Sequence, residues 1–222
     1  MKKGLILISL ILILIPNITA GETNEIDDFL KGMTTFWDGV DTMVADFTQK
    51  KRLELFDAEM VSSGEFAFKK PGTMIWRYDP PDDTIMAVKP GLVTIYFRAN
   101  NKAKVIHLNE DDKVPQAMTF GFGGSGDIKG LKDKFHISLK NNGKDGTLTL
   151  ISKKKGEGDG FEKVIITFKN DFTPVSTKIH YSKEDVTTFE FSKVEINGPA
   201  KDEAFDLVLP KGVEVEEIGA GR

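Results

Sequence analysis

The chain has 222 residues, with 30 Lys and Arg against 34 Asp and Glu, and a formal net charge of −4 at pH 7. This acidic balance argues against nucleic acid or an anionic membrane surface as a general partner, because both repel a negatively charged protein. The sequence contains no cysteine, which excludes disulfides, thiol chemistry, Cys-based metal sites and an N-terminal lipid anchor on Cys.

The first twenty residues have the pattern of an export signal. Two lysines precede an apolar run over residues 5–15, which Pro16 ends, and the small residues Ala20 and Gly21 follow. The run is shorter than the roughly 20 residues that cross a bilayer. We therefore expect a secretory signal peptide over 1–20, cleaved after Ala20 or Gly21.

The remaining residues, 21–222, are expected to form one domain, since no change in composition divides them. Their first element is a predicted amphipathic helix over 26–47, with acidic residues in its first turn. Its apolar positions follow helical spacing, namely Ile26, Phe29, Leu30, Met33, Phe36, Trp37, Val40, Met43, Val44 and Phe47.

The most sharply patterned stretch is residues 64–78, which predicts a β-hairpin with an aromatic face. Phe66 and Phe68 alternate before a Pro-Gly turn, and Met74, Trp76 and Tyr78 alternate after it. Such a face suits either the interior of a large sheet or the wall of an apolar cavity. Composition alone does not choose between the two.

Alternating segments separated by short turn signals then recur along the chain, which is typical of an antiparallel meander. The predicted strands cover residues 84–88, 92–98, 104–108, 135–140, 147–152, 163–169, 175–181, 186–191 and 205–209.

Residues 110–134 interrupt this pattern and predict a short helix, a glycine-rich joint and a second short helix. Gly121, Gly123 and Gly126 have the spacing of a dinucleotide loop, but the βαβ unit that this motif requires is missing from the pattern. A plain surface loop and a mobile apolar flap jointed by glycines both remain open.

No catalytic motif is recognisable, and no cofactor or metal is expected. His107, His136 and His180 are isolated in the sequence, and Ser125 lacks the flanking residues of a nucleophile elbow. A pair of carboxylates brought together by folding would leave no local motif. The sequence therefore favours a protein that is not an enzyme.

Several fragments together resemble the LolA-type family of periplasmic outer-membrane lipoprotein carriers. They occur in the order typical of that family and cover most of the chain. The fragments are DFTQ at 46–49, GEFAFKKPG at 64–72, WRY at 76–78, PP at 80–81, KPG at 89–91 before Tyr96, and FDLVLPKGVEV at 205–215.

The resemblance implies a mainly β fold: an unclosed antiparallel β-barrel (half-barrel) of about eleven strands, covered by one long N-terminal helix and short central helices. The helices would act as a lid over an apolar cavity for acyl chains. The cavity residues implied are Phe36, Trp37, Met43, Phe47, Phe66, Phe68, Met74, Trp76, Tyr78, Ile95, Phe97, Met118, Phe120 and Phe122.

Lys70 marks a departure from this family, whose members commonly carry Arg just before the Pro of the hairpin turn. The resemblance implies that this residue holds the lid, and Lys70 can donate hydrogen bonds but lacks the planar fork of Arg. We expect it to reach backbone carbonyls near residues 120–126.

The implied function is that of a monomeric periplasmic carrier of lipoproteins. It would load from an inner-membrane ABC-type release complex and unload to an outer-membrane acceptor. A carrier of another envelope lipid, a lipid- or lipoprotein-sensing regulatory domain without transport, and an envelope hydrolase are the alternatives.

Overall fold

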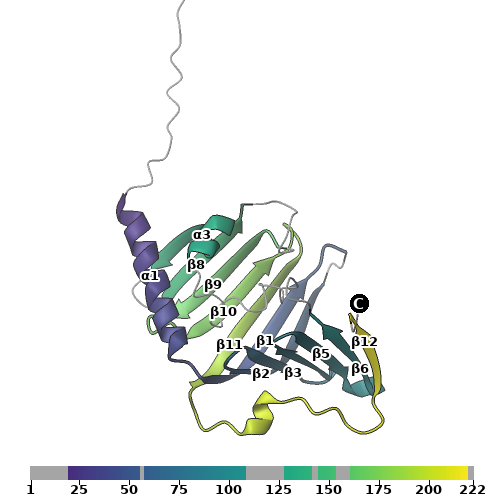
Figure 1. The fold of residues 1–222 in the computed structure, drawn as a ribbon. Coiled ribbons are helices and arrows are strands. Elements are labelled where there is room, and N and C mark those ends of the chain that lie inside the picture. The colour runs from purple at the N-terminus through teal and green to yellow at the C-terminus, as the bar shows by residue number, and fades with distance from the viewer. Residues whose placement is uncertain (1–19, 56–57, 109–127, 142–144, 154–160, 220–222) are drawn as a thin grey trace, which may run out of the picture.

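The computed structural model describes residues 20–55, 58–108, 128–141, 145–153 and 161–219. Its dominant feature is one sheet of twelve strands in the order β12-β6-β5-β4-β3-β2-β1-β11-β10-β9-β8-β7 (Figure 1). The strands are β1 Thr42–Arg52, β2 Glu59–Lys69, β3 Thr73–Tyr78, β4 Thr84–Lys89, β5 Leu92–Phe97, β6 Lys102–His107, β7 Phe135–Asn141, β8 Asp145–Ser152, β9 Lys163–Lys169, β10 Pro174–His180, β11 Val186–Ile196 and β12 Glu214–Ile218.

The sheet is unclosed, because β12 and β7 stand at opposite ends of the strand order. Neighbouring strands are antiparallel except β12, which runs parallel to β6. The mainly β, unclosed architecture was predicted, with twelve strands in place of about eleven. Strand β12 was missed because every residue of its sequence EVEEI is exposed, which leaves no alternation of buried and exposed positions to recognise.

Two α-helices are described, α1 Ala20–Asp38 and α3 Ile128–Lys134, with short 3-10 turns η1 Arg98–Asn100 and η2 Asp202–Phe205. Helix α3 coincides with the second of the two short helices expected in the glycine-rich segment. Residues 109–127, which include the expected first short helix and the joint, lie outside the described residues.

The prediction of a helix over 26–47 was wrong in its second half. Helix α1 ends at Asp38, where the Gly39 and Val40 amides close the last turn on carbonyls three residues back. Residues from Thr42 onward form β1, which pairs with both β2 and β11. The apolar positions up to Phe47 fit the helical period better than the alternating one, but two ladders of backbone hydrogen bonds stabilise the strand instead.

The strand predicted at 205–209 was also wrong. This segment follows η2 as an extended chain without a strand partner, and it crosses the outer face of the sheet below β2 and β3 (Figure 1). Arg77 of β3 anchors η2 and the start of this segment: its guanidinium donates to the carbonyls of Glu203, Ala204 and Asp206 at 2.8–3.0 Å.

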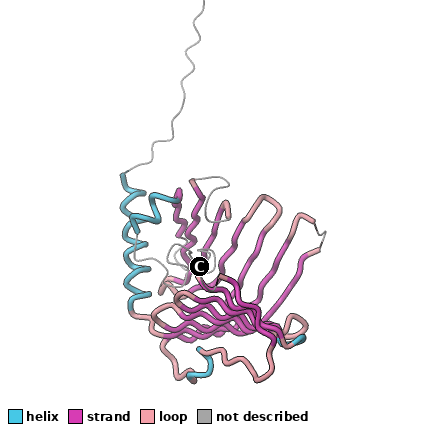
Figure 2. Tube along the Cα trace, turned by 45° about the vertical axis from the view of Figure 1, so that its right-hand side comes forward, coloured by secondary structure: helices cyan, strands magenta, loops and turns pink. Residues whose placement is uncertain are grey.

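The two faces of the sheet are covered differently. On one face, α1 packs through Leu30 against β8–β10 and through Trp37 against β1–β3, and α3 packs there through Leu131. The sheet curves around these helices, so this face is concave (Figure 2). On the opposite face, Ile75, Ile85, Ala87, Tyr96 and Ala103 are buried beneath Leu207, Leu209 and Val213.

Candidate functional site

The concave face carries an aromatic surface built by strand alternation. On β2 and β3, the cross-strand pairs Phe66–Trp76 and Phe68–Met74 both point inward. The Phe66 and Trp76 rings lie 4.8 Å apart between centroids, and Phe47 of β1 meets Tyr78 edge-on at 5.1 Å. This surface presents aromatic rings and methionine side chains, which suit a flexible apolar ligand.

Helix α1 covers the aromatic surface with its last two turns. Trp37 packs edge-on against Phe68 at 5.9 Å, and Phe36 packs edge-on against Trp37 at 5.4 Å. Trp37 is only 4% exposed and Met43 beneath it is fully buried. In this arrangement the helix occupies the apolar surface, so an incoming apolar ligand would have to displace it.

A second contact seats the middle of α1 on the turn between β9 and β10. Phe172 in that turn lies 5.3 Å from Phe29 and 6.2 Å from Phe36 between ring centroids. Gly32 makes the approach possible, because a Cβ at that position would stand 2.6 Å from the Phe172 ring.

The turn between α1 and β1 is fixed by two residues from outside it. The Lys70 ammonium donates to the Asp38 carbonyl at 2.6 Å. The Asn197 side chain donates to the Gly39 carbonyl at 2.7 Å and accepts from the backbone N–H groups of Asp41 and Thr42 at 2.8 and 3.1 Å. Together these residues satisfy the polar groups of the chain as it leaves α1, and we call this set the hinge clamp.

The comparisons with known proteins point to one family. The family described as "Outer membrane lipoprotein carrier protein LolA" matches residues 38–208. The chain belongs to the LolA family.

A relative from Hahella chejuensis, named outer-membrane lipoprotein carrier protein, is 24% identical over 176 residues, covering 79% of this chain and 82% of its own. Among solved structures, an uncharacterized conserved protein from Thermus thermophilus superposes with a TM-score of 0.53 at 10% identity, covering 87% of this chain and 99% of its own. MucB gives a TM-score of 0.53 at 11% identity, with 83% of this chain and 63% of its own covered. At such low identity the two structures support the fold of this LolA-family chain.

Nine residues expected to form the cavity of this LolA-family protein lie together on the concave face. They are Phe36, Trp37, Met43, Phe47, Phe66, Phe68, Met74, Trp76 and Tyr78. Ile95 and Phe97 of β5 follow Val93 on the same face and are partly buried, but Val93 is the β5 residue that packs against this cluster. Met118, Phe120 and Phe122 lie outside the described residues.

Sequence reasoning missed the β11 part of the same surface. Phe189, Phe191, Val194 and Ile196 pack against the cluster. The strand at 186–191 was predicted, but its sequence is largely polar, so its inner face was not assigned to the aromatic surface. In the structure β11 pairs with β1, and Phe191 lies opposite Phe47, which places the aromatic residues of β11 on the concave face.

Lys70 in this LolA-family chain contacts the end of α1, as its bond to Asp38 shows. The expected bonds to carbonyls near 120–126 fall on residues outside the described part of the chain. Asn197, the other half of the hinge clamp, was read from the sequence only as part of an Asn-Gly turn signal. Its φ of 52° is left-handed, a conformation that Asn tolerates better than most residues.

The polar groups within the concave face are few and electrically neutral. Burial, followed by the nearby Asp82 and then Tyr181, raises the pKa of Tyr78 to about 12, so its phenol stays protonated at neutral pH. Thr177 on β10 is 3% exposed, and its buried hydroxyl has no hydrogen-bond partner among the described residues. The face therefore offers apolar contact and isolated hydroxyls, with no buried charge among the described residues of its core.

Within the described residues, no group of three or more His, Cys, Asp or Glu is arranged to hold a metal ion. No helix in that part of the chain is long and apolar enough to cross a membrane.

Proposed function

We propose that this protein is a periplasmic carrier that binds the acyl chains of lipoproteins on its concave aromatic surface. Two observations support this: the LolA family match over 38–208, and a concave cluster that unites Phe66, Trp76 and Phe47 under one helix. Members of this family are carriers and not enzymes, and we extend that assignment to this chain.

The energetics suit a carrier. An acyl chain of about sixteen carbons gains more than about 10 kcal/mol on leaving water, at about 0.8 kcal/mol per methylene. In the described arrangement Trp37 and Phe36 already cover the surface, so part of that gain is used to displace α1. The net affinity falls by the free energy of opening, which allows an acceptor with a better site to take the cargo.

The transport route follows from the same proposal. The protein would be exported with cleavage after Ala20 or Gly21, load as a monomer from an inner-membrane ABC-type release complex, and unload to an outer-membrane acceptor. We assign α1 and the segment around Met118, Phe120 and Phe122 as the lid. Ile95 and Phe97 would extend the acyl surface toward β6.

Photo-crosslinking tests the site directly. A photoreactive phenylalanine analogue at position 36, in the last turns of α1, should crosslink to lipoproteins in cells. The same analogue at Val208, which is 79% exposed on the opposite side of the sheet, is the matched control and should not. Equal yields at both positions would refute binding on the concave surface.

The cargo class needs a second measurement, mass spectrometry of the species crosslinked at position 36. Lipoproteins support the proposed carrier, whereas a glycolipid or isoprenoid would assign another envelope lipid. Transfer of lipopeptide from the loaded protein to acceptor vesicles separates a carrier from a sensing domain, which would hold its ligand without passing it on. A changed ligand mass would indicate a hydrolase.

A further inference from the structure

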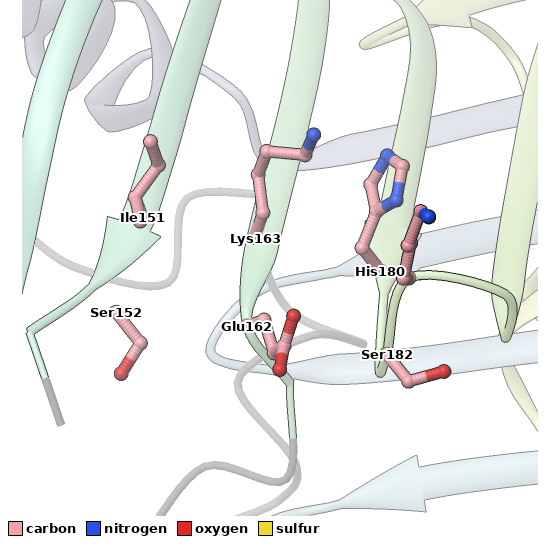
Figure 3. Close-up of a pocket in the computed structure, with 7 residues that line it drawn as sticks. Ile151, Ser152, Glu162, Lys163, His180 and Ser182 are labelled. Atoms are coloured by element: carbon pink, nitrogen blue, oxygen red, sulfur yellow. The ribbon is translucent and has the colours of Figure 1, made fainter. Parts of the chain in front are cut away.

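A cavity with two lysines, a histidine and two serines in its lining opens on the face of the sheet opposite the aromatic surface, at the ends of β8, β9 and β10 (Figure 3). Strand pairing aligns Ile151, Lys163 and His180 in one row across these strands. Their neighbours Leu150, Val164 and Ile179 point the other way, into the core under α1. The cavity measures about 360 Å³ and is lined by Ile151, Ser152, Glu162, Lys163, His180, Ser182 and Lys183.

Several hydrogen-bond donors of this cavity have no acceptor among the described residues. The ammonium groups of Lys163 and Lys183 form no ion pair with any described carboxylate, although ten other Lys or Arg side chains pair with carboxylates there. The Nε2 atom of His180 is buried and has no hydrogen-bond partner in that part of the chain. Buried polar groups are normally satisfied, so the unpartnered Nε2 of His180 beside the ammonium groups of the half-buried Lys163 and the exposed Lys183 indicates a site for an acceptor.

Ser182 adds a further donor. Its Oγ accepts from the backbone N–H groups of Glu184 and Asp185 at 3.2 and 2.9 Å. Both bonds occupy the lone pairs of the oxygen, so the hydroxyl proton remains available to an outside acceptor.

The charged residues that line the cavity are two lysines, Lys163 and Lys183, against one glutamate, Glu162. The pKa of His180 is lowered, first by burial and then by the positive charges of Lys163 and Lys178. The carboxylate of Glu162 acts to raise this pKa but offsets the lowering only in part. Ile151 and Val186, the nearest cross-strand positions on β8 and β11, carry no charge. An anion in the cavity would offset the repulsion that disfavours the imidazolium, and would thus raise the pKa of His180.

We propose that this cavity binds the phosphate group of a small phosphate ester through Lys163, Lys183, Ser182 and His180. A phosphate offers acceptor oxygens in several directions, which suits two ammonium groups, a hydroxyl and an imidazole arriving from three chain segments. The volume is within the range of small-molecule sites and leaves room for a group of the size of glycerol beside the phosphate. The site is independent of the acyl surface, because the sheet separates the two.

Histidine NMR tests the proposal, since the chain has only three His residues and two of them serve as internal references. His136 and His107 lie outside the cavity, and His107 faces Glu217 at 3.3 Å. Inorganic phosphate or glycerol 3-phosphate, titrated at constant ionic strength against chloride, should shift the His180 ring signals saturably and raise the pKa of His180. The other two His signals should stay unchanged.

The double variant Lys163→Gln, Lys183→Gln should weaken this binding by at least about tenfold, as expected for the loss of charged hydrogen bonds. Lys140→Gln is the matched control: it makes the same kind of charge change on an exposed residue of β7, which does not line the cavity, and should bind as the wild type does.

Three outcomes decide the proposal. No saturable shift at His180 up to about 20 mM phosphate, well above a millimolar Kd, would overturn it. Equal shifts at all three His residues would also overturn it, because they would report a general salt effect. A saturable shift of the His180 signal with glycerol 3-phosphate supports the proposal. Vesicles of phosphatidylglycerol and of phosphatidylcholine then identify the source of the phosphate. Broadening of the His180 signal by phosphatidylglycerol alone indicates a lipid headgroup, and no broadening by either vesicle indicates a soluble ester.

Discussion

Removing the Asn197 side chain should release α1 from the sheet without unfolding the protein. In Asn197→Gly, three hydrogen bonds to Gly39, Asp41 and Thr42 are lost while glycine retains the left-handed φ of 52°. Each such bond contributes about 0.5–1.5 kcal/mol. Since the turn is exposed, we take about 0.7 kcal/mol for each bond, in the lower half of that range, and expect about 2 kcal/mol in total, or about a 30-fold change in an equilibrium.

Hydrogen exchange measures this change locally. Amides of residues 30–38 in α1 should exchange about 30-fold faster in Asn197→Gly, while those of β10 should be little affected. Lipopeptide binding should strengthen by up to the same factor, because displacing α1 then costs less.

A matched control exists at the other end of the sheet. Asn101 has the same φ of 52°, and its side chain accepts from the Tyr96 hydroxyl at 3.1 Å and donates to the Gly212 carbonyl at 3.0 Å, far from α1 in the fold. Asn101→Gly should lower the thermal midpoint without speeding exchange in α1. If both variants lower the midpoint and leave α1 exchange equal, the hinge clamp has no specific control over the helix and the reasoning is refuted.

Substitutions at three further positions test the buried hydroxyl, the close approach of two strands and the contact at the end of α1. Thr177→Val should stabilise the empty protein by about 1–3 kcal/mol in denaturant unfolding, because it removes a buried hydroxyl without a partner among the described residues; destabilisation would show that the hydroxyl is satisfied. Gly64→Ala should lower the thermal midpoint severely, since its Cβ would stand 1.9 Å from the Arg77 carbonyl oxygen, and a native-like midpoint would contradict this close approach. Lys70→Leu removes the hydrogen bond to the Asp38 carbonyl, so it should tighten lipopeptide binding and slow lipopeptide transfer to vesicles by up to about fivefold. Lys70→Arg keeps a donor and should not slow the transfer. Equal transfer rates in both variants and the wild type would show that Lys70 has no role beyond the turn.

The sequence predicted the aromatic hairpin well because its large aromatic residues fall at alternate positions of both strands and the turn carries Pro-Gly. Phe66, Phe68, Met74 and Trp76 therefore appear on one face in the structure as expected. Their alternate neighbours, such as Ile75, are equally buried on the other face. That second burial could not be predicted, because it depends on a C-terminal segment distant in the chain.

The end of α1 was mispredicted for a related reason. Val40, Met43 and Phe47 fit a helical stripe, and the alternation of Met43 with Ala45 is weak because Ala carries little apolar signal. Pairing of β1 with β2 and β11, more than a hundred residues away in the second case, decides the conformation. Local periodicity cannot contain that information.

The hinge clamp could not be predicted either, because it also depends on contacts between residues far apart in the sequence. A turn signal such as Asn197-Gly198 predicts a change of direction, but it does not say which distant carbonyl the amide will meet. Its partner Gly39 lies 158 residues earlier in the chain.

The same residues serve as core and as proposed ligand site, and this couples stability to affinity. Trp37 and Phe36 bury the surface that an acyl chain would cover, so each improvement in their packing against Phe68 stabilises the empty protein and weakens cargo binding by an equal free energy. A carrier needs that balance, because a fully seated helix would never load and an absent one would never release. Gly32 beneath Phe172 and the exposed bond from Lys70 to Asp38 keep the helix seated through contacts that are each modest and can be broken without disturbing the sheet.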